Sequence, residues 1–195
     1  MSIYGQLEKQ AAKYSLRRTE LRSTFLTAGR TEIDHNVFSA SIPRRLTIGL
    51  VTSKAFNGNV KLSPFKFQHF NLRELSVHAA GHIFPAVPYN FNFDKKHFMR
   101  GYIDLYEALS QSNSDRSCGI TLDQFASGWT IFVISLTSTL DDSCGFELLR
   151  SGTTSIHLKF NAPLPEGVEM VVMGEFDQML MIDYNRRVML DSNIG

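Results

Sequence analysis

Alternating apolar and polar positions are the dominant pattern of this chain, and they predict β-strands. Leu46, Ile48 and Leu50 alternate with small or polar residues, which is the period of two expected where one face of a strand meets a core. A longer β run covers residues 168–182, and Gly174 within it predicts a bend or bulge. These patterns therefore predict a protein built on antiparallel β-sheets.

Further strand-like segments follow the same pattern, separated by turns. They are residues 16–26, 33–38, 75–79 with a return at 82–85, and 156–160. Ala80-Gly81 predicts the tip of a hairpin between 75–79 and 82–85. The continuous apolar run at 129–136 predicts a central strand covered on both faces.

Two segments predict helices instead. Residues 95–110 carry apolar side chains at helical spacing, and Asp94 is placed to cap the free N–H groups at the start. Thr121 and Gln124 have the spacing of a capping box. Residues 1–15 predict an arm or a short helix, with Leu7, Ala11 and Tyr14 on one helical face.

Together these elements predict an all-β chain. The expected fold is a single antiparallel jelly-roll β-sandwich of about eight strands with one inserted helix at about 95–110. The expected organisation is an N-terminal arm at 1–15, a jelly-roll domain at 16–191 and a C-terminal tail at 192–195.

The segment that leads from residue 55 to residue 70 combines a turn with an aromatic cluster. Asn57-Gly58 supplies the positive φ values of a tight turn. The phenylalanines that follow Pro64 predict a strand edge or wall of the core. A base-stacking platform formed with Lys66 and His69 is the weaker alternative.

Composition restricts the function classes. The 195 residues are 43% apolar and 20% charged, and no apolar run approaches the roughly 20 residues of a membrane-spanning helix. The N-terminal sequence lacks the pattern of a secretory signal, so cytoplasm or nucleus is expected and secretion is not. The net charge of +1 provides no global field for a polyanion, although the N-terminal arm is basic and leaves weak nucleic-acid contact open.

Motifs of catalysis are absent from the sequence. There is no G-x-S-x-G, P-loop or G-x-G-x-x-G, and Cys118 and Cys144 are interpreted as reduced thiols. A Cys–His–Asp triad with His157 can be drawn, but spacing adds nothing to it. His78 and His82 are four apart in what predicts a hairpin, so a metal site is disfavoured and no cofactor is expected.

Several segments, taken in order, resemble one protein family. They are IPRRLTIGLV at 42–51, AFNGN at 55–59, PFKFQHFNL at 64–72, GWTIFVISLT at 128–137, NAPLPEGVEMVV at 161–172 and GEFDQMLMIDYNRRVMLD at 174–191. Over residues 12–191 the chain resembles the major capsid proteins of Maverick/Polinton elements and adintoviruses. The matching structural positions are Pro43, Phe56, Asn57, Gly58, Phe65, Phe67, His69, Phe70, Glu175, Phe176, Asp177 and Asp183.

The resemblance implies a fold and a role. Members of that family have two jelly rolls in one chain, and their trimers form pseudo-hexagonal tiles of an icosahedral shell. This chain resembles the second jelly roll only. It departs from the family at the hairpin tip 78–81 and in the variable loop 110–119.

The leading hypothesis is a non-enzymatic, self-associating protein of capsid ancestry. Its expected partners are copies of itself, in a homo-oligomer such as a trimer, or other capsid subunits, and its expected location is the virion if it is viral. The candidate subunit-contact residues are Tyr102, Tyr106, Trp129, Arg17 and Arg18.

Two alternatives belong to other function classes. One is a jelly-roll module that binds a carbohydrate or a protein through loops such as 90–94 and 112–117. The other is a cupin-like metalloenzyme that uses His78, His82 or His157, although the His-x-His pair of cupins is missing.

Overall fold

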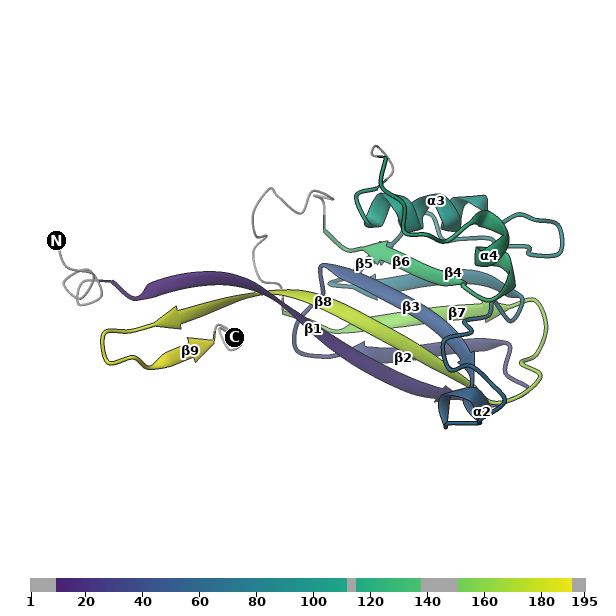
Figure 1. The fold of residues 1–195 in the computed structure, drawn as a ribbon, viewed down its shortest axis with the longest axis horizontal. Coiled ribbons are helices and arrows are strands. Elements are labelled where there is room, and N and C mark those ends of the chain that lie inside the picture. Colours follow the sequence, from purple (N-terminus) through teal and green to yellow (C-terminus); the bar gives the residue numbers. More distant parts are fainter. Residues whose placement is uncertain (1–9, 112–114, 138–150, 191–195) are drawn as a thin grey trace.

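The computed structural model describes residues 10–111, 115–137 and 151–190, which form two β-sheets packed face to face (Figure 1). Sheet A has the order β1-β8-β3-β6, with β9 also paired to β8, and sheet B has the order β2-β7-β4-β5. The strands are β1 (Ala12–Leu26), β2 (Glu32–Phe38), β3 (Arg45–Thr52), β4 (Leu72–Ala79), β5 (His82–Phe84), β6 (Ile131–Ser135), β7 (Thr154–Phe160), β8 (Val168–Ile182) and β9 (Val188–Leu190).

The connectivity is that of a jelly roll. Every strand ladder is antiparallel, and β1 to β4 alternate between the two sheets, as do β6 to β8. The first and eighth strands pair along their whole length, from Ala12 opposite Ile182 to Leu26 opposite Val168. The predicted fold class, an antiparallel jelly-roll sandwich, is confirmed.

The core lies between the sheets and follows the period of two. Leu46 and Ile48 of β3 face Leu75 of β4 and Ile156 and Leu158 of β7 across the sandwich, and all five are fully buried. Each such side chain contributes roughly 1.5–3 kcal/mol through removal of its surface from water. These positions fix which face of every strand points inward.

Three helices complete the described fold: α2 (Ser53–Phe56), α3 (Met99–Ala108) and α4 (Leu122–Ser127). The helix expected at about 95–110 is confirmed with shorter bounds, but the Asp94 cap is wrong. Phe98 is the N-cap and makes no side-chain cap hydrogen bond, whereas Asn92 Oδ1 accepts from the Lys95 N–H. The capping box of Thr121 and Gln124 at α4 is confirmed.

The prediction of a central strand at 129–136 is wrong in its position. Consecutive Phe132, Val133 and Ile134 are buried, yet β6 is the end strand of sheet A. Helix α3 packs along β6 and covers this edge (Figure 1). An edge strand covered by a helix is as apolar as a central strand, so the residue pattern cannot separate the two.

Other local predictions also need correction. The ladders from Gly174 to β1 and β3 run without a bulge, and a Cβ on Gly174 would lie 2.8 Å from the Phe38 ring. The glycine therefore admits an aromatic ring of the core. By contrast, the turn predicted at Asn57-Gly58 is confirmed: it ends the single turn of α2, and Gly58 has the expected positive φ, at +94°.

The two ends of the phenylalanine-rich segment also differ from expectation. Residues 57–70 contain no strand, although Phe67 makes an isolated parallel bridge with Trp129. The predicted helical face at 1–15 is wrong where it can be seen, since Tyr14 lies in β1 and residues 1–9 are outside the described residues. The Asp141-Asp142-Ser143 segment, whose sequence predicts a turn, is outside them as well.

An extension of sheet A projects beyond the sandwich. We call it the ribbon: residues 12–17 of β1, residues 177–182 of β8, and β9. Figure 1 shows it leaving the body at one end, past the last strands of sheet B. The N-terminal arm is thus a β-structure whose partner strands come from the other end of the chain.

Candidate functional site

The outer face of sheet A, which points away from the core, carries exposed apolar side chains. Leu21 of β1 and Met173 of β8 are opposite each other in the ladder, and Phe25 follows Leu21 on the same face. Leu21 is 68% exposed, Phe25 57% and Met173 39%. We call these three residues the outer patch. A sheet that packs on one face only would ordinarily present polar residues here.

The outer face of sheet B is different, because it is charged. Glu32 of β2 lies 3.4 Å from Lys159 Nζ and 3.4 Å from His157 Nε2, both of β7. Glu74 of β4 lies 3.8 Å from the same Lys159 ammonium. The two outer faces therefore differ in chemistry, and sheet A has the one suited to burial against a protein.

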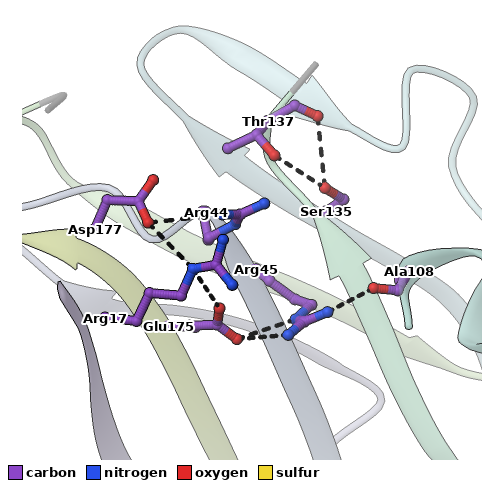
Figure 2. A network of polar contacts seen from close by, with 8 residues as sticks. All are labelled: Arg17, Arg44, Arg45, Ala108, Ser135, Thr137, Glu175 and Asp177. Carbon is purple, nitrogen blue, oxygen red and sulfur yellow. Dashed lines mark hydrogen bonds and ion pairs between the residues drawn. The ribbon is translucent and has the colours of Figure 1, made fainter. Parts of the chain in front are cut away.

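At the base of the ribbon, arginines and carboxylates form a network on the outer face of sheet A (Figure 2). Glu175 and Asp177 come from β8, Arg17 from β1, and Arg44 and Arg45 from the start of β3. Arg17 Nε is 3.6 Å from Asp177 Oδ1 and 3.7 Å from Glu175 Oε1. Arg44 Nη1 is 3.6 Å from Asp177 Oδ1, and both of these side chains are less than 10% exposed.

Arg45 connects this network to helix α3. Its Nε and Nη2 donate to Glu175 Oε2 at 3.2 and 2.6 Å, and its Nη1 donates to the Ala108 carbonyl at 2.7 Å. Ala108 is the last residue of α3, where free carbonyls attract a cation. The network is therefore a structural clamp that holds the helix, the sheet and the root of the ribbon together.

The candidate contact residues lie in different surroundings. Trp129 is 49% exposed and is bridged to Phe67, whose ring covers Gly49 on the outer face of β3. Arg17 and Arg18 point to opposite faces of β1: Arg17 joins the clamp, whereas Arg18 pairs with Glu20 and lies 5.0 Å from the Phe176 ring centre.

Tyr102 and Tyr106 brace the chain internally. Their hydroxyl groups donate to the Ile120 carbonyl at 3.0 and 2.9 Å, so α3 holds the segment that leads into α4. Both side chains are half-buried against the core. The structure thus places these two tyrosines between α3 and α4 and does not bring them together with Trp129.

The residues that carried the family resemblance have structural roles. Phe176 packs edge-to-face on Phe38 at 5.1 Å in the core. Asp183 closes the ribbon turn, because its Oδ1 accepts from the Arg187 N–H at 2.8 Å. Pro43 is buried just before β3, and Phe56 and Asn57 lie at the end of α2. Phe65 is 70% exposed, whereas Phe70 packs against the core and has a φ of +45°.

The histidines proposed for metal chemistry do not form such a site. His78 and His157 lie on neighbouring strands of sheet B with ring centres 6.4 Å apart, on its outer face. In the described part of the chain, no three His, Cys, Asp or Glu side chains gather closely enough to hold a metal ion. Cys118 is a free thiol, and Cys144 is outside the described residues.

A small cavity of about 310 Å³ opens beside His69, between the 68–71 loop, α4 and the 162–165 loop. His69 stacks on Phe93 at 4.0 Å, and its Nδ1 accepts from the Asn71 N–H at 3.0 Å. Burial lowers the pKa of His69, so the imidazole stays neutral at neutral pH. In the 90–94 loop, proposed for ligand binding, Phe91 and Phe93 are buried in the core.

Residue patterns alone missed the outer patch. Leu21 and Phe25 stand four apart in a strand, which predicts a shared face, but the sequence does not say whether that face is the core. The pairing of Leu21 with Met173 depends on the β1–β8 register across the whole chain. Among the described residues, no helix has the length and apolar character that crossing a membrane requires.

Comparison with known proteins places this fold. No family model matches the chain. An uncharacterized protein of Caenorhabditis elegans is 33% identical over 190 residues, which cover 95% of this chain and 45% of that protein. The chain thus spans less than half the length of this relative.

Solved structures give the fold relationship. A chain of the Sputnik virophage structure matches with a TM-score of 0.54 at 13% identity, covering 95% of this chain and 39% of that one. This likeness agrees with the jelly-roll fold described above. The PBCV-1 virus capsid (TM-score 0.49, 9% identity, 93% and 51% coverage) and the mavirus major capsid protein (0.45, 10%, 93% and 41%) are further matches.

Proposed function

We propose that this chain is a non-enzymatic structural protein that acts by self-association through the outer face of sheet A. The observation that carries the proposal is the outer patch: Leu21, Phe25 and Met173 are exposed on an otherwise well-packed sandwich, while the opposite outer face is charged. Exposed apolar groups on a rigid sheet are typical of surfaces that become buried on assembly. The capsid-type fold is consistent with this role.

The ancestry is also part of the proposal. We infer descent from the same double jelly-roll lineage as the major capsid proteins of Maverick/Polinton elements and adintoviruses, with this chain as the second jelly roll. The partners would be further copies, as in a trimer, or other capsid subunits, and the location would be the virion or, in a domesticated form, the cytoplasm or nucleus. Genes for a packaging ATPase and a capsid protease beside this gene would support a viral role.

Trp129 and Arg17 belong to the proposed contact surface in different ways. Trp129 borders the outer face through Phe67 and is half-exposed, so it can be buried by a neighbour. Arg17 is 30% exposed at the rim of the clamp. Because Arg17 and Arg18 both lie beside carboxylates, nucleic-acid contact through the arm is expected to be weak and salt-dependent.

The test is the oligomeric state of the whole chain and of a patch variant. Sedimentation velocity at tens to hundreds of micromolar should show oligomers for the unmodified protein. Leu21→Glu should weaken association at least tenfold, because a charge would have to be buried at the contact. Val60→Glu, at a fully exposed loop position outside sheet A, is the matched control and should associate normally.

Monomers alone at the highest concentration would contradict the proposal. Normal association of Leu21→Glu would remove the outer patch from it.

A jelly-roll module that binds a small ligand is the second candidate, favoured by the cavity beside His69. Saturable binding of a glycan by a persistent monomer, lost on His69→Ala, would favour that candidate instead.

A further inference from the structure

In the part of the chain that the structure describes, no second layer covers the apolar side of the ribbon. The core-facing positions of β8 in the sandwich, such as Val172 and Phe176, continue at the same parity to Leu180 and Ile182 in the ribbon. Sheet B ends before this point, so the ribbon is a single layer (Figure 1). The sequence therefore continues a core-facing pattern where no sheet of the described residues lies opposite it.

The ladder register shows how regular this face is. Tyr14, Leu180 and Leu190 form one cross-strand row. The next row is Ala12, Ile182 and Val188. Both rows lack charged residues, and Tyr14, Val188 and Leu190 are each more than half exposed. We call these two rows the ribbon face.

A surface of this kind needs a partner. A three-stranded sheet gains stability only when an apolar face is covered. The turn at the tip is nevertheless well formed, because the Asp183 carboxylate accepts from the Arg187 N–H and the Arg186 N–H donates to the Asp183 carbonyl. The ribbon thus has a hydrogen-bonded turn at its tip and an exposed apolar face, which together indicate a segment that packs against another subunit.

We propose that the ribbon face of one copy docks on the outer patch of a second copy. This inference rests on the proposed function and names the segment that the outer patch receives. It pairs two apolar surfaces of sheet A with each other, which lie on opposite faces and at different ends of that sheet. Such a contact is head-to-tail, so it can close into a ring of subunits.

Charge agrees with a second copy as the occupant, and size indicates that this contact is one of several in an assembly. With three strands about 4.8 Å apart and two rows about 6.6 Å apart along them, the ribbon face covers roughly 190 Å². One contact is then smaller than the roughly 800 Å² per partner of a stable dimer, whereas each subunit of a ring makes two contacts. The ribbon together with its turn at 183–187 has two more basic than acidic residues, Lys13, Arg17, Arg186 and Arg187 against Asp177 and Asp183, while the whole chain has net charge +1. The rest of the chain is therefore slightly negative.

The test uses two complementary variants of the whole chain. Val188→Glu alters only the ribbon face, and Leu21→Glu alters only the outer patch; both sites are exposed, so folding should persist, as circular dichroism and melting temperature will show. Each variant alone should associate at least tenfold more weakly than the unmodified protein. A mixture of the two should regain a one-to-one contact, because Leu21→Glu keeps an intact ribbon and Val188→Glu keeps an intact outer patch.

Fluorescence cross-correlation of the two differently labelled variants measures this recovery. The mixture of the two variants should give a higher cross-correlation than a sample in which one variant alone carries both labels. Val60→Glu serves as the control. Loss of association in both variants without recovery would overturn the head-to-tail contact, since a symmetric contact cannot be complemented this way. Normal association of Val188→Glu would overturn the role of the ribbon and leave the proposed function standing. An unmodified protein that stays monomeric would overturn both.

Discussion

At the residue scale, Glu169 is a buried carboxyl whose ionisation lowers the stability of the folded state. It lies on β8 between Phe25 of β1 and Val51 of β3 in the ladder and is only 8% exposed. Burial raises the pKa of Glu169 above the ordinary value of 4.5, because desolvation disfavours the charged form. Folding therefore opposes ionisation of this group, and the folded state loses stability as pH rises past its ordinary pKa.

Replacing Glu169 with glutamine should remove this cost. At pH 7 the Glu169→Gln protein should have the larger free energy of unfolding, and the difference should shrink as pH falls below 4.5, where the carboxyl is protonated in both states. Urea unfolding from pH 4 to pH 7 measures it. Glu166→Gln, at a more exposed carboxylate 3.2 Å from Lys54 Nζ, is the control and should show no such gain. A Glu169→Gln protein less stable than the original at pH 7 would contradict the argument.

Residue patterns could not have found Glu169 or the outer patch. Glutamate in a strand is ordinarily solvated, and its burial here follows from the neighbours that pairing brings to it. In the same way Leu21 and Met173 are 152 positions apart and meet only through the β1–β8 ladder. Gly49 is a further example. It lies within a predicted strand, but only the tertiary structure shows that the Phe67 ring would lie 2.6 Å from a Cβ at this position.

At the element scale, strands in which buried and exposed residues alternate could be predicted from the sequence. The positions of elements that are buried by a neighbouring helix or that extend beyond the core could not. β7 and residues 170–178 of β8 bury every second residue, so their period is visible in the sequence. β6 was misplaced because α3 covers its edge. Only the first residues of β1, 12–15, were predicted as part of a helix or arm, because this end of the strand lies outside the sandwich core and so carries no strong constraint on pattern.

Helix α3 is attached to sheet A by Arg45, and this attachment should be measurable. Arg45→Ala removes the bond to the Ala108 carbonyl and the two short bonds to Glu175, a carboxylate that is only 15% exposed and whose Oε1 lies 3.7 Å from Arg17 Nε. We expect a loss of about 2 kcal/mol in unfolding free energy, since charged hydrogen bonds contribute about 1.5–3 kcal/mol each and this site is partly solvated. Denaturant unfolding provides the value.

The matched control for Arg45 is Lys54→Ala, which breaks the exposed pair with Glu166. Lys54 is 71% exposed, so its removal should cost about 0.5 kcal/mol or less. Equal losses for the two variants would show that the clamp does not hold α3. A larger loss for Arg45→Ala, with reduced helical signal, would establish it.

At the scale of the whole molecule, the jelly roll joins its two ends. β1 and β8 pair over fifteen residues each, so the body of the sandwich is closed by a contact between the start and the end of the described chain. The ribbon continues the same ladder without a core beneath it. The molecule thus has one cooperative body and one extension whose stability depends on what covers it.

Hydrogen exchange should distinguish these two parts and report assembly directly. In dilute protein, amides of β8 in the body, such as Val172, should exchange only through global unfolding, whereas those of Leu180 and Leu190 should exchange through local opening of the ribbon. At high concentration a ribbon buried against a second copy should gain protection, while the amides of the body change little. Exchange by mass spectrometry across a concentration series measures both. Ribbon protection that does not depend on concentration would mean that the ribbon face is stable uncovered, and it would count against docking on a neighbouring subunit.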